Sequence, residues 1–287
     1  MAATDQQFVQ MTDEEAIYQE SVALMEKRGR RLRRAALTAG VFQAISILCM
    51  IYTTIAVRWV LIEWQQPEKT VYQLADNMGM FKVGILADGL NVVADTFVGV
   101  LLGLILIGAG VNPATSSLII VFKVLQQAIM CLNVVFMFVA CVLVDENLSI
   151  YKTIHNYFYS DNMPPIGTQI TYILLLLNKY GTIVAEVFCG IHLLMLGITI
   201  VLWGVFPRWM GYIITVAGPC MIFNSLLFII WPGYDGDMGL LWHLPMLIAE
   251  FWLCGWMLVN VPHPAKNRAF FPATAVEEPA DEAPQKE

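Results

Sequence analysis

A set of polar and ionisable side chains interrupts the apolar segments of this 287-residue chain. Asp88, Asn91 and Asp95 are spaced three and then four residues apart, so a helix would present them on one face. An ionisable group at mid-bilayer costs about 2.5–3.5 kcal/mol on insertion scales, and it is therefore expected to face other helices and find a partner there. The full set of candidate site residues is Asp88, Asn91, Asp95, Lys123, Gln127, Asn133, Glu186, His192 and Glu250.

The position of these residues along their helices predicts two polar layers. At about 1.5 Å per residue from the expected helix ends, Asp95, His192 and Glu250 fall near the middle of the bilayer. Asp88 and Glu186 fall nearer the outer side. Such layers either hydrogen-bond the helices to one another or line a ligand cavity or a transport path.

Carboxyl groups outnumber cations in these segments, so it matters whether the Lys123 ammonium neutralises one of them. Its long side chain can lift the ammonium to Asp95 and neutralise both charges, or it can extend to the cytoplasmic headgroups. Carboxyls without a cation would be protonated or bound to His192, and such groups can relay protons. His243, near the outer boundary, is interpreted as an interfacial residue.

Sequence motifs of enzymes and metal sites are missing. The chain has no H-E-x-x-H, no G-x-S-x-G, no Walker loop and no histidine pair at ligand spacing. Glu186 and His192 are six residues apart, which is poor spacing for a shared metal on one helix. All six cysteines lie in apolar segments and are interpreted as core residues. We therefore expect a protein that is not an enzyme and holds no metal and no cofactor.

Membrane-spanning helices must position these residues. Apolar residues make up 58% of the chain and charged residues 14%, a balance that a water-soluble domain of this length would not tolerate. A spanning helix needs roughly 20 mainly apolar residues. We expect an all-α, six-transmembrane-helix bundle over residues 35–261, with spans at 35–57, 81–107, 117–144, 179–203, 209–231 and 239–261.

Further segments flank or interrupt the expected bundle. Thr12 with Glu15 forms a capping-box pattern, and the segment 1–34 begins acidic and ends basic, which predicts an N-terminal amphipathic helix. This helix either lies along the membrane surface and bends into the first span or forms a solvated extension. Residues 166–177 are apolar but too few to span, and we expect a short outer-face helix that continues into the fourth span. Residues 262–287 form an acidic, Pro/Ala-rich cytoplasmic tail, for which composition predicts disorder.

Charge distribution predicts the orientation. Six basic residues lie between 27 and 34, directly before the first span, while the loops on the opposite side are acidic. Basic residues favour the cytoplasmic side, so both termini are expected in the cytoplasm and the protein in the inner membrane. Because this basic cluster abuts a span, it does not indicate nucleic acid, and the expected partners are the lipid bilayer and other membrane protein subunits.

Several short stretches carry a family resemblance. They are Ala-Asp-Gly-Leu-Asn-Val-Val-Ala-Asp at 87–95, Phe-Lys-Val-Leu-Gln-Gln-Ala at 122–128 with Asn133, Tyr-Gly at 180–181, Gly-Ile-His-Leu-Leu-Met-Leu-Gly at 190–197, Phe-Pro-Arg at 206–208 and Ala-Glu at 249–250. With them, residues 34–261 resemble a family of bacterial polytopic membrane proteins named domain of unknown function 4386. Where that family usually has arginine this chain has Lys123, which lacks the planar fork that holds two carboxylates at once. The resemblance implies a fold and no activity.

The sequence is compatible with two functions. The first is a non-catalytic accessory or scaffold subunit of a larger membrane complex. The alternative is a transporter or small-ligand-binding membrane protein with a proton-sensitive site at Asp95, His192 and Glu250, which requires a water-filled cavity at that layer. A membrane enzyme acting on lipid would need a nucleophile or metal that no motif supplies.

Overall fold

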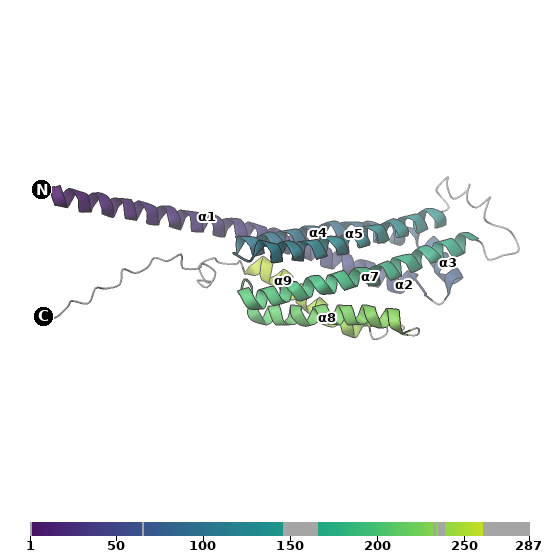
Figure 1. The fold of residues 1–287 in the computed structure, drawn as a ribbon. Helices are drawn as coiled ribbons and strands as arrows, with labels where there is room; N and C mark the ends of the chain where they lie inside the picture. Colours follow the sequence, from purple (N-terminus) through teal and green to yellow (C-terminus); the bar gives the residue numbers. More distant parts are fainter. Residues whose placement is uncertain (1, 65, 146–165, 232–233, 235–238, 261–287) are drawn as a thin grey trace.

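In the computed structural model, which describes residues 2–64, 66–145, 166–231, 234 and 239–260, every regular element is a helix (Figure 1). The predicted tail at 262–287 lies outside the described residues. The elements are α1 (Ala2–Tyr52), the π-helix η1 (Thr53–Arg58), α2 (Trp59–Leu61), α3 (Pro67–Asp76), α4 (Met78–Gly108), α5 (Pro113–Val144), α7 (Ile166–Trp203), α8 (Arg208–Ile230) and α9 (Gly239–Val259).

Six helical stretches are long and apolar enough to cross a bilayer: Val22–Leu61, Met78–Gly108, Pro113–Val144, Gly167–Trp203, Arg208–Ile230 and Trp242–Val259. The prediction of an all-α bundle with six spans is confirmed, and the protein is a multi-pass membrane protein. Such helices satisfy all their backbone hydrogen bonds internally, as the hydrocarbon core requires.

The six long helices follow one another around a closed ring. Each packs against the next one along the chain, from α1 to α4, α5, α7, α8 and α9, and α9 packs back against α1. Figure 1 shows these helices running along a common direction. Side chains that face inward from all six helices therefore meet in one interior.

Two apolar cores fill opposite ends of this interior. The larger one lies toward the end from which α1 projects, and each of the six helices contributes to it, with Leu32, Ile105, Ile119, Leu196, Ile214 and Leu253 among its members. The smaller one lies toward the α3 end and joins buried residues of η1, α2, α3, α4, α5 and α7, such as Val57, Leu61, Leu74, Phe81, Met137 and Leu175. The polar candidates on α4, α5, α7 and α9 lie between these ends.

The helix α1 corrects one expectation. It runs unbroken from Ala2 to Tyr52, so of the two alternatives expected for residues 1–34 the one with a bend into the first span is wrong. Leu32, Ala36 and Ala39 are buried in the larger core at helical spacing, and this apolar face crosses the expected boundary without a break. The Arg28 guanidinium Nε also donates a 2.9 Å hydrogen bond to the carbonyl of Gly108, at the end of α4. The part of α1 before Arg28 projects beyond the bundle (Figure 1).

Residues 166–177 form the first turns of α7, a single 38-residue helix that continues into the fourth span. At about 1.5 Å per residue this helix is longer than the ~30 Å hydrocarbon core, so it extends past the bilayer on the α3 side. There the Tyr172 hydroxyl donates to the carbonyl of Trp64, just before α3. The sequence analysis missed α3, although Pro67 at its first position and Glu68 in its first turn are typical helix-start signals.

Backbone contact without intervening side chains joins α7 to α8. A Cβ added at Gly218 would lie 2.6 Å from the carbonyl oxygen of Gly190 and 2.7 Å from the amide nitrogen of Leu194. Only a glycine fits this approach, and small residues at helix contacts are the usual device of close packing in membranes.

Substitution of Gly218 by alanine tests this contact. We expect Gly218→Ala to lower the free energy of unfolding by about 1–3 kcal/mol, because overpacking forces the two backbones apart. Unfolding by SDS titration from mild detergent measures the change. Gly89→Ala is the matched control, because nothing lies within 4 Å of a Cβ at that position. Equal losses in the two variants would contradict the assigned packing.

Candidate functional site

An ion pair between α4 and α5 lies in the middle of the bundle. The Lys123 ammonium is 2.6 Å from Asp95 Oδ2, and the Gln127 amide donates to the same oxygen at 2.5 Å. Lys123 is 5% exposed and Asp95 8% exposed. Of the two alternatives for Lys123, the structure shows the pairing with Asp95 and not the extension to the headgroups, so one buried positive charge and one buried negative charge compensate each other.

The absence of a side chain at Gly99 makes room for this pair. Gly99 follows Asp95 by one turn on α4, and a Cβ there would overlap the stem of Lys123. The lysine stem can therefore lie flat across α4 while its ammonium reaches Asp95. No spacing rule in the sequence indicated this role of Gly99.

His192 and Glu250, the other members of the predicted middle layer, do not contact one another in the structure. The His192 Nδ1 lies 2.9 Å from the carbonyl oxygen of Ile119 on α5, so this nitrogen carries the hydrogen and donates it. His192 is 2% exposed and thus ties α7 to α5. The Glu250 carboxyl has neither a hydrogen bond nor an ion-pair partner among the described residues. It lies within electrostatic range of both Asp95 and Lys123.

Asp88 and Asn91 face the first span. Asp88 Oδ2 lies 3.5 Å from a guanidinium nitrogen of Arg58, the last residue of η1. Ser46 on α1 donates a 2.7 Å hydrogen bond to Asn91 Oδ1. The polar stripe of α4 is therefore shared, with Asp88 and Asn91 toward the first span and Asp95 toward α5.

The sequence analysis missed Arg58 as a partner because the expected first span ended at residue 57. The structure extends helical backbone through η1 and α2 as far as Leu61. A π-turn contains an additional residue compared with an α-turn and so rotates the side chains that follow it. Arg58 stands at the end of that turn, where its guanidinium meets Asp88.

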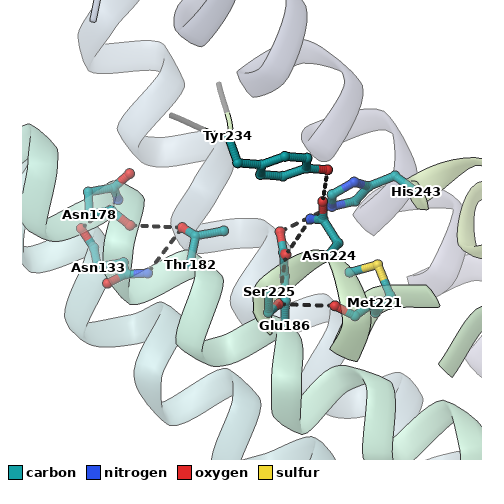
Figure 2. Close-up of polar contacts among 9 residues, drawn as sticks. All are labelled: Asn133, Asn178, Thr182, Glu186, Met221, Asn224, Ser225, Tyr234 and His243. Atoms are coloured by element: carbon teal, nitrogen blue, oxygen red, sulfur yellow. Dashed lines mark hydrogen bonds and ion pairs between the residues drawn. The ribbon is translucent and has the colours of Figure 1, made fainter. Parts of the chain in front are cut away.

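Glu186 is the centre of a second polar cluster, which joins α7, α8 and α9 (Figure 2). Its Oε1 lies 3.1 Å from His243 Nε2, and its Oε2 accepts from the Asn224 amide at 3.3 Å and the Ser225 hydroxyl at 3.2 Å. The side chains of His243 and Glu186 are 27% and 15% exposed, so protein atoms do not fully enclose either of them. His243, which is expected near the outer boundary, contacts the only carboxylate of this cluster among the described residues.

Tyr234, in the segment after α8, also joins the Glu186 cluster. Its hydroxyl donates to Asn224 Oδ1 at 2.9 Å (Figure 2). Burial raises the pKa of Tyr234, and the nearby Glu186 carboxylate raises it as well. The hydroxyl therefore stays protonated and keeps donating at neutral pH.

Asn133 hydrogen-bonds α5 to α7. Its amide donates to Thr182 Oγ1 at 3.3 Å, and Asn178 donates to the backbone carbonyl of Asn133 at 3.2 Å (Figure 2). A Cβ at Gly181 would overlap Asn133 Oδ1, which explains the glycine at that position. Asn133 thus belongs to the contact between α5 and α7.

Among the described residues, no group of three or more His, Cys, Asp or Glu side chains is arranged to hold a metal ion. All six cysteines are free thiols. Within this part of the chain, the chemistry that the clusters offer is proton exchange and hydrogen bonding by carboxyl, imidazole and ammonium groups.

Comparison with known proteins identifies one family. Residues 38–260, which contain all nine candidate site residues, match the family described as domain of unknown function (DUF4386). No curated protein and no solved structure matches the chain.

Removal of the Lys123 charge tests the buried pair. We expect Lys123→Met to lower the free energy of unfolding by about 3–5 kcal/mol, because it leaves Asp95 buried without a counter-charge. Adding Asp95→Asn to that variant should restore most of the loss, since no net charge then remains. SDS titration of the purified protein measures both.

The control for this cycle is Lys69→Met. Lys69 pairs with Glu63 beside α3, but both side chains are more than a third exposed. Exposed pairs contribute about 0–1 kcal/mol, so this variant should remain near wild type. A Lys123→Met protein as stable as Lys69→Met would show that Asp95 does not depend on Lys123.

Proposed function

The chain belongs to the family of domain of unknown function 4386, and within it we propose a non-catalytic role, as an accessory or scaffold subunit of a larger membrane complex. The observation that carries this proposal is the projection of α1 from the bundle. Arg28 and Leu32 of α1 contact the bundle, and residues 2–27 of the same helix precede them and project beyond it (Figure 1). At about 1.5 Å per residue they form a rod of about 39 Å.

A helix that projects in this way is a surface for another protein. In proteins, helices derive most of their stability from packing of an apolar face. Val22 and Leu24 are 42% and 59% exposed, and Tyr18, one turn before Val22, is 65% exposed. An apolar groove on a partner subunit would cover Tyr18 and Val22 together, since they are four residues apart on one face.

The location of this surface follows from charge. The basic residues between 27 and 34 mark the membrane boundary of α1, and basic residues favour the cytoplasmic side. We therefore place the projecting part of α1, and both chain termini, in the cytoplasm beneath the inner membrane. The partner would be a membrane subunit or a soluble protein docked to it.

Co-purification tests the accessory role. From the native membrane in mild detergent, the full-length protein is expected to carry a stoichiometric partner, visible as added mass by light scattering and identifiable by mass spectrometry. Tyr18→Glu with Val22→Glu should release that partner, because two charges would enter the apolar contact. Ala23→Glu, on a different face of α1, should retain it. A clean monomer of the wild-type chain would contradict the proposal.

A second candidate function, a proton-sensitive transporter or ligand-binding protein, is favoured by Glu250. Ionisable groups inside membrane spans commonly mark substrate pathways or proton relays. Asp88, Asp95 and Glu186 each have a partner, but Glu250 has none among the described residues. Its carboxyl is therefore available to bind a proton or a cation.

Proton uptake into proteoliposomes tests this candidate. A pH-sensitive dye trapped in the lumen reports acidification after an external acid pulse, with a membrane potential that is negative inside. Proteoliposomes with wild-type protein are expected to acidify faster than empty liposomes. Glu250→Gln should abolish the difference, while Glu26→Gln in the projecting part of α1 should preserve it. Wild-type protein that is no faster than empty liposomes would contradict the candidate.

A further inference from the structure

Glu250 faces the interior of the ring but is more exposed than its inward neighbours. Residues three, four or seven positions away share its helical face, and Met246, Leu253, Cys254 and Met257 are all 8% exposed or less. Glu250 itself is only partly buried. An inward side chain with residual accessibility requires space beside it.

The partial exposure follows one line along α9. His243, Leu247 and Glu250, at helical spacing, are all partly exposed, and the line ends at the buried Cys254. The Cys254 thiol lies 3.5 Å from the carbonyl of Gly40, so α1 and α9 are in contact at that point. The accessible line therefore has a closed end beyond Glu250.

The two ends of this line differ in polarity. At the α3 end stand Glu186 and His243, with Asn224 and Ser225 beside them (Figure 2). The apolar core to which all six helices contribute includes Leu253 and Met257 beyond Glu250, and on α9 it begins at Met246 beside the line. Seven residues separate His243 from Glu250, which corresponds to about 10 Å along the helix axis.

From this arrangement we infer that the ring encloses a water-filled crevice, entered from the α3 end beside Glu186 and His243 and ending at Glu250, which takes up a proton from that side alone. The inference deepens the second candidate function and rests on it. Uptake forms one O–H bond at a carboxylate oxygen of Glu250 and breaks one O–H bond of a hydronium ion in the crevice, which leaves a neutral water molecule.

Protonation of Glu250 changes the electrostatic interactions of the charged and titratable groups around it. Asp95 on α4, Lys123 on α5, Cys189 on α7, and His243 and Cys254 on α9 are within electrostatic range. While Glu250 is ionised, the Lys123 ammonium is attracted by two carboxylates. Once Glu250 is neutral, Asp95 alone holds Lys123, through the 2.6 Å contact seen here.

Carbodiimide labelling of sealed vesicles tests the direction of proton access. Dicyclohexylcarbodiimide adds to protonated carboxyls in membranes, and peptide mass spectrometry locates the adduct. Proteolysis of the projecting part of α1 reports the orientation of the vesicles. Raising the pH on the α3 side is expected to reduce labelling of Glu250 severalfold, and raising it on the α1 side should leave labelling unchanged. Dependence on the α1-side pH, or on neither side, would overturn the inference.

Cysteine accessibility tests the water in the crevice independently of proton chemistry. In a background without the six native cysteines, Glu250→Cys should react with a membrane-impermeant thiosulfonate added on the α3 side, and Leu253→Cys, one turn deeper in the apolar core, should not. Gel filtration of each variant verifies folding. Equal reactivity of the two positions, or labelling of Glu250→Cys only by a lipid-soluble maleimide, would refute the crevice.

These outcomes are separable from those of the transport assay. Labelling of Glu250 that follows the α3-side pH, in a protein that carries no protons across liposomes, would retain the crevice and discard the transporter. Proton transport that survives Glu250→Gln, with Glu250→Cys unreactive to the aqueous reagent, would retain transport and discard the crevice.

Discussion

The ion pair between Lys123 and Asp95 is the interaction that the interior of the ring must accommodate. Each charge alone would be costly to hold between helices in lipid, and each is compensated only because α4 and α5 approach closely enough for a 2.6 Å contact. That approach depends on Gly99, where the lysine stem occupies the place of a side chain. The position of α5 against α4, and the depth at which the polar layer lies, follow from this pair.

Much of the fold could be predicted because lipid imposes strict requirements. Apolar segments of sufficient length must be helices, and consecutive antiparallel helices pack as neighbours, which together define six spans. Polar residues within the spans were identifiable as inward-facing for the same reason. Charge and side-chain length gave the pairing of Lys123 with Asp95 as one of two alternatives, and the structure shows this one.

Other contacts could not be predicted because they depend on the rotation of each helix about its own axis. His192 is at the expected depth but turns toward the carbonyl of Ile119, and His243, taken as interfacial, meets Glu186 across the bundle. Arg58 reaches Asp88 only after a π-turn that no local spacing signalled. The depth of a side chain in the bilayer can be estimated by counting residues along its helix. Which residue it contacts depends on the crossing angles and the exact geometry of the helices.

The unbroken course of α1 has a mechanical consequence. A single α-helix is stiff along its axis, and α1 joins the projecting segment to the wall of the ring without a loop or hinge. Tilting or twisting the outer portion therefore moves Ser46 against Asn91 within the membrane. At its far end α1 continues directly into η1, whose last residue, Arg58, contacts Asp88 of the same stripe. The helix α1 therefore couples movement of the segment that projects from the bundle to the polar stripe of α4 inside it.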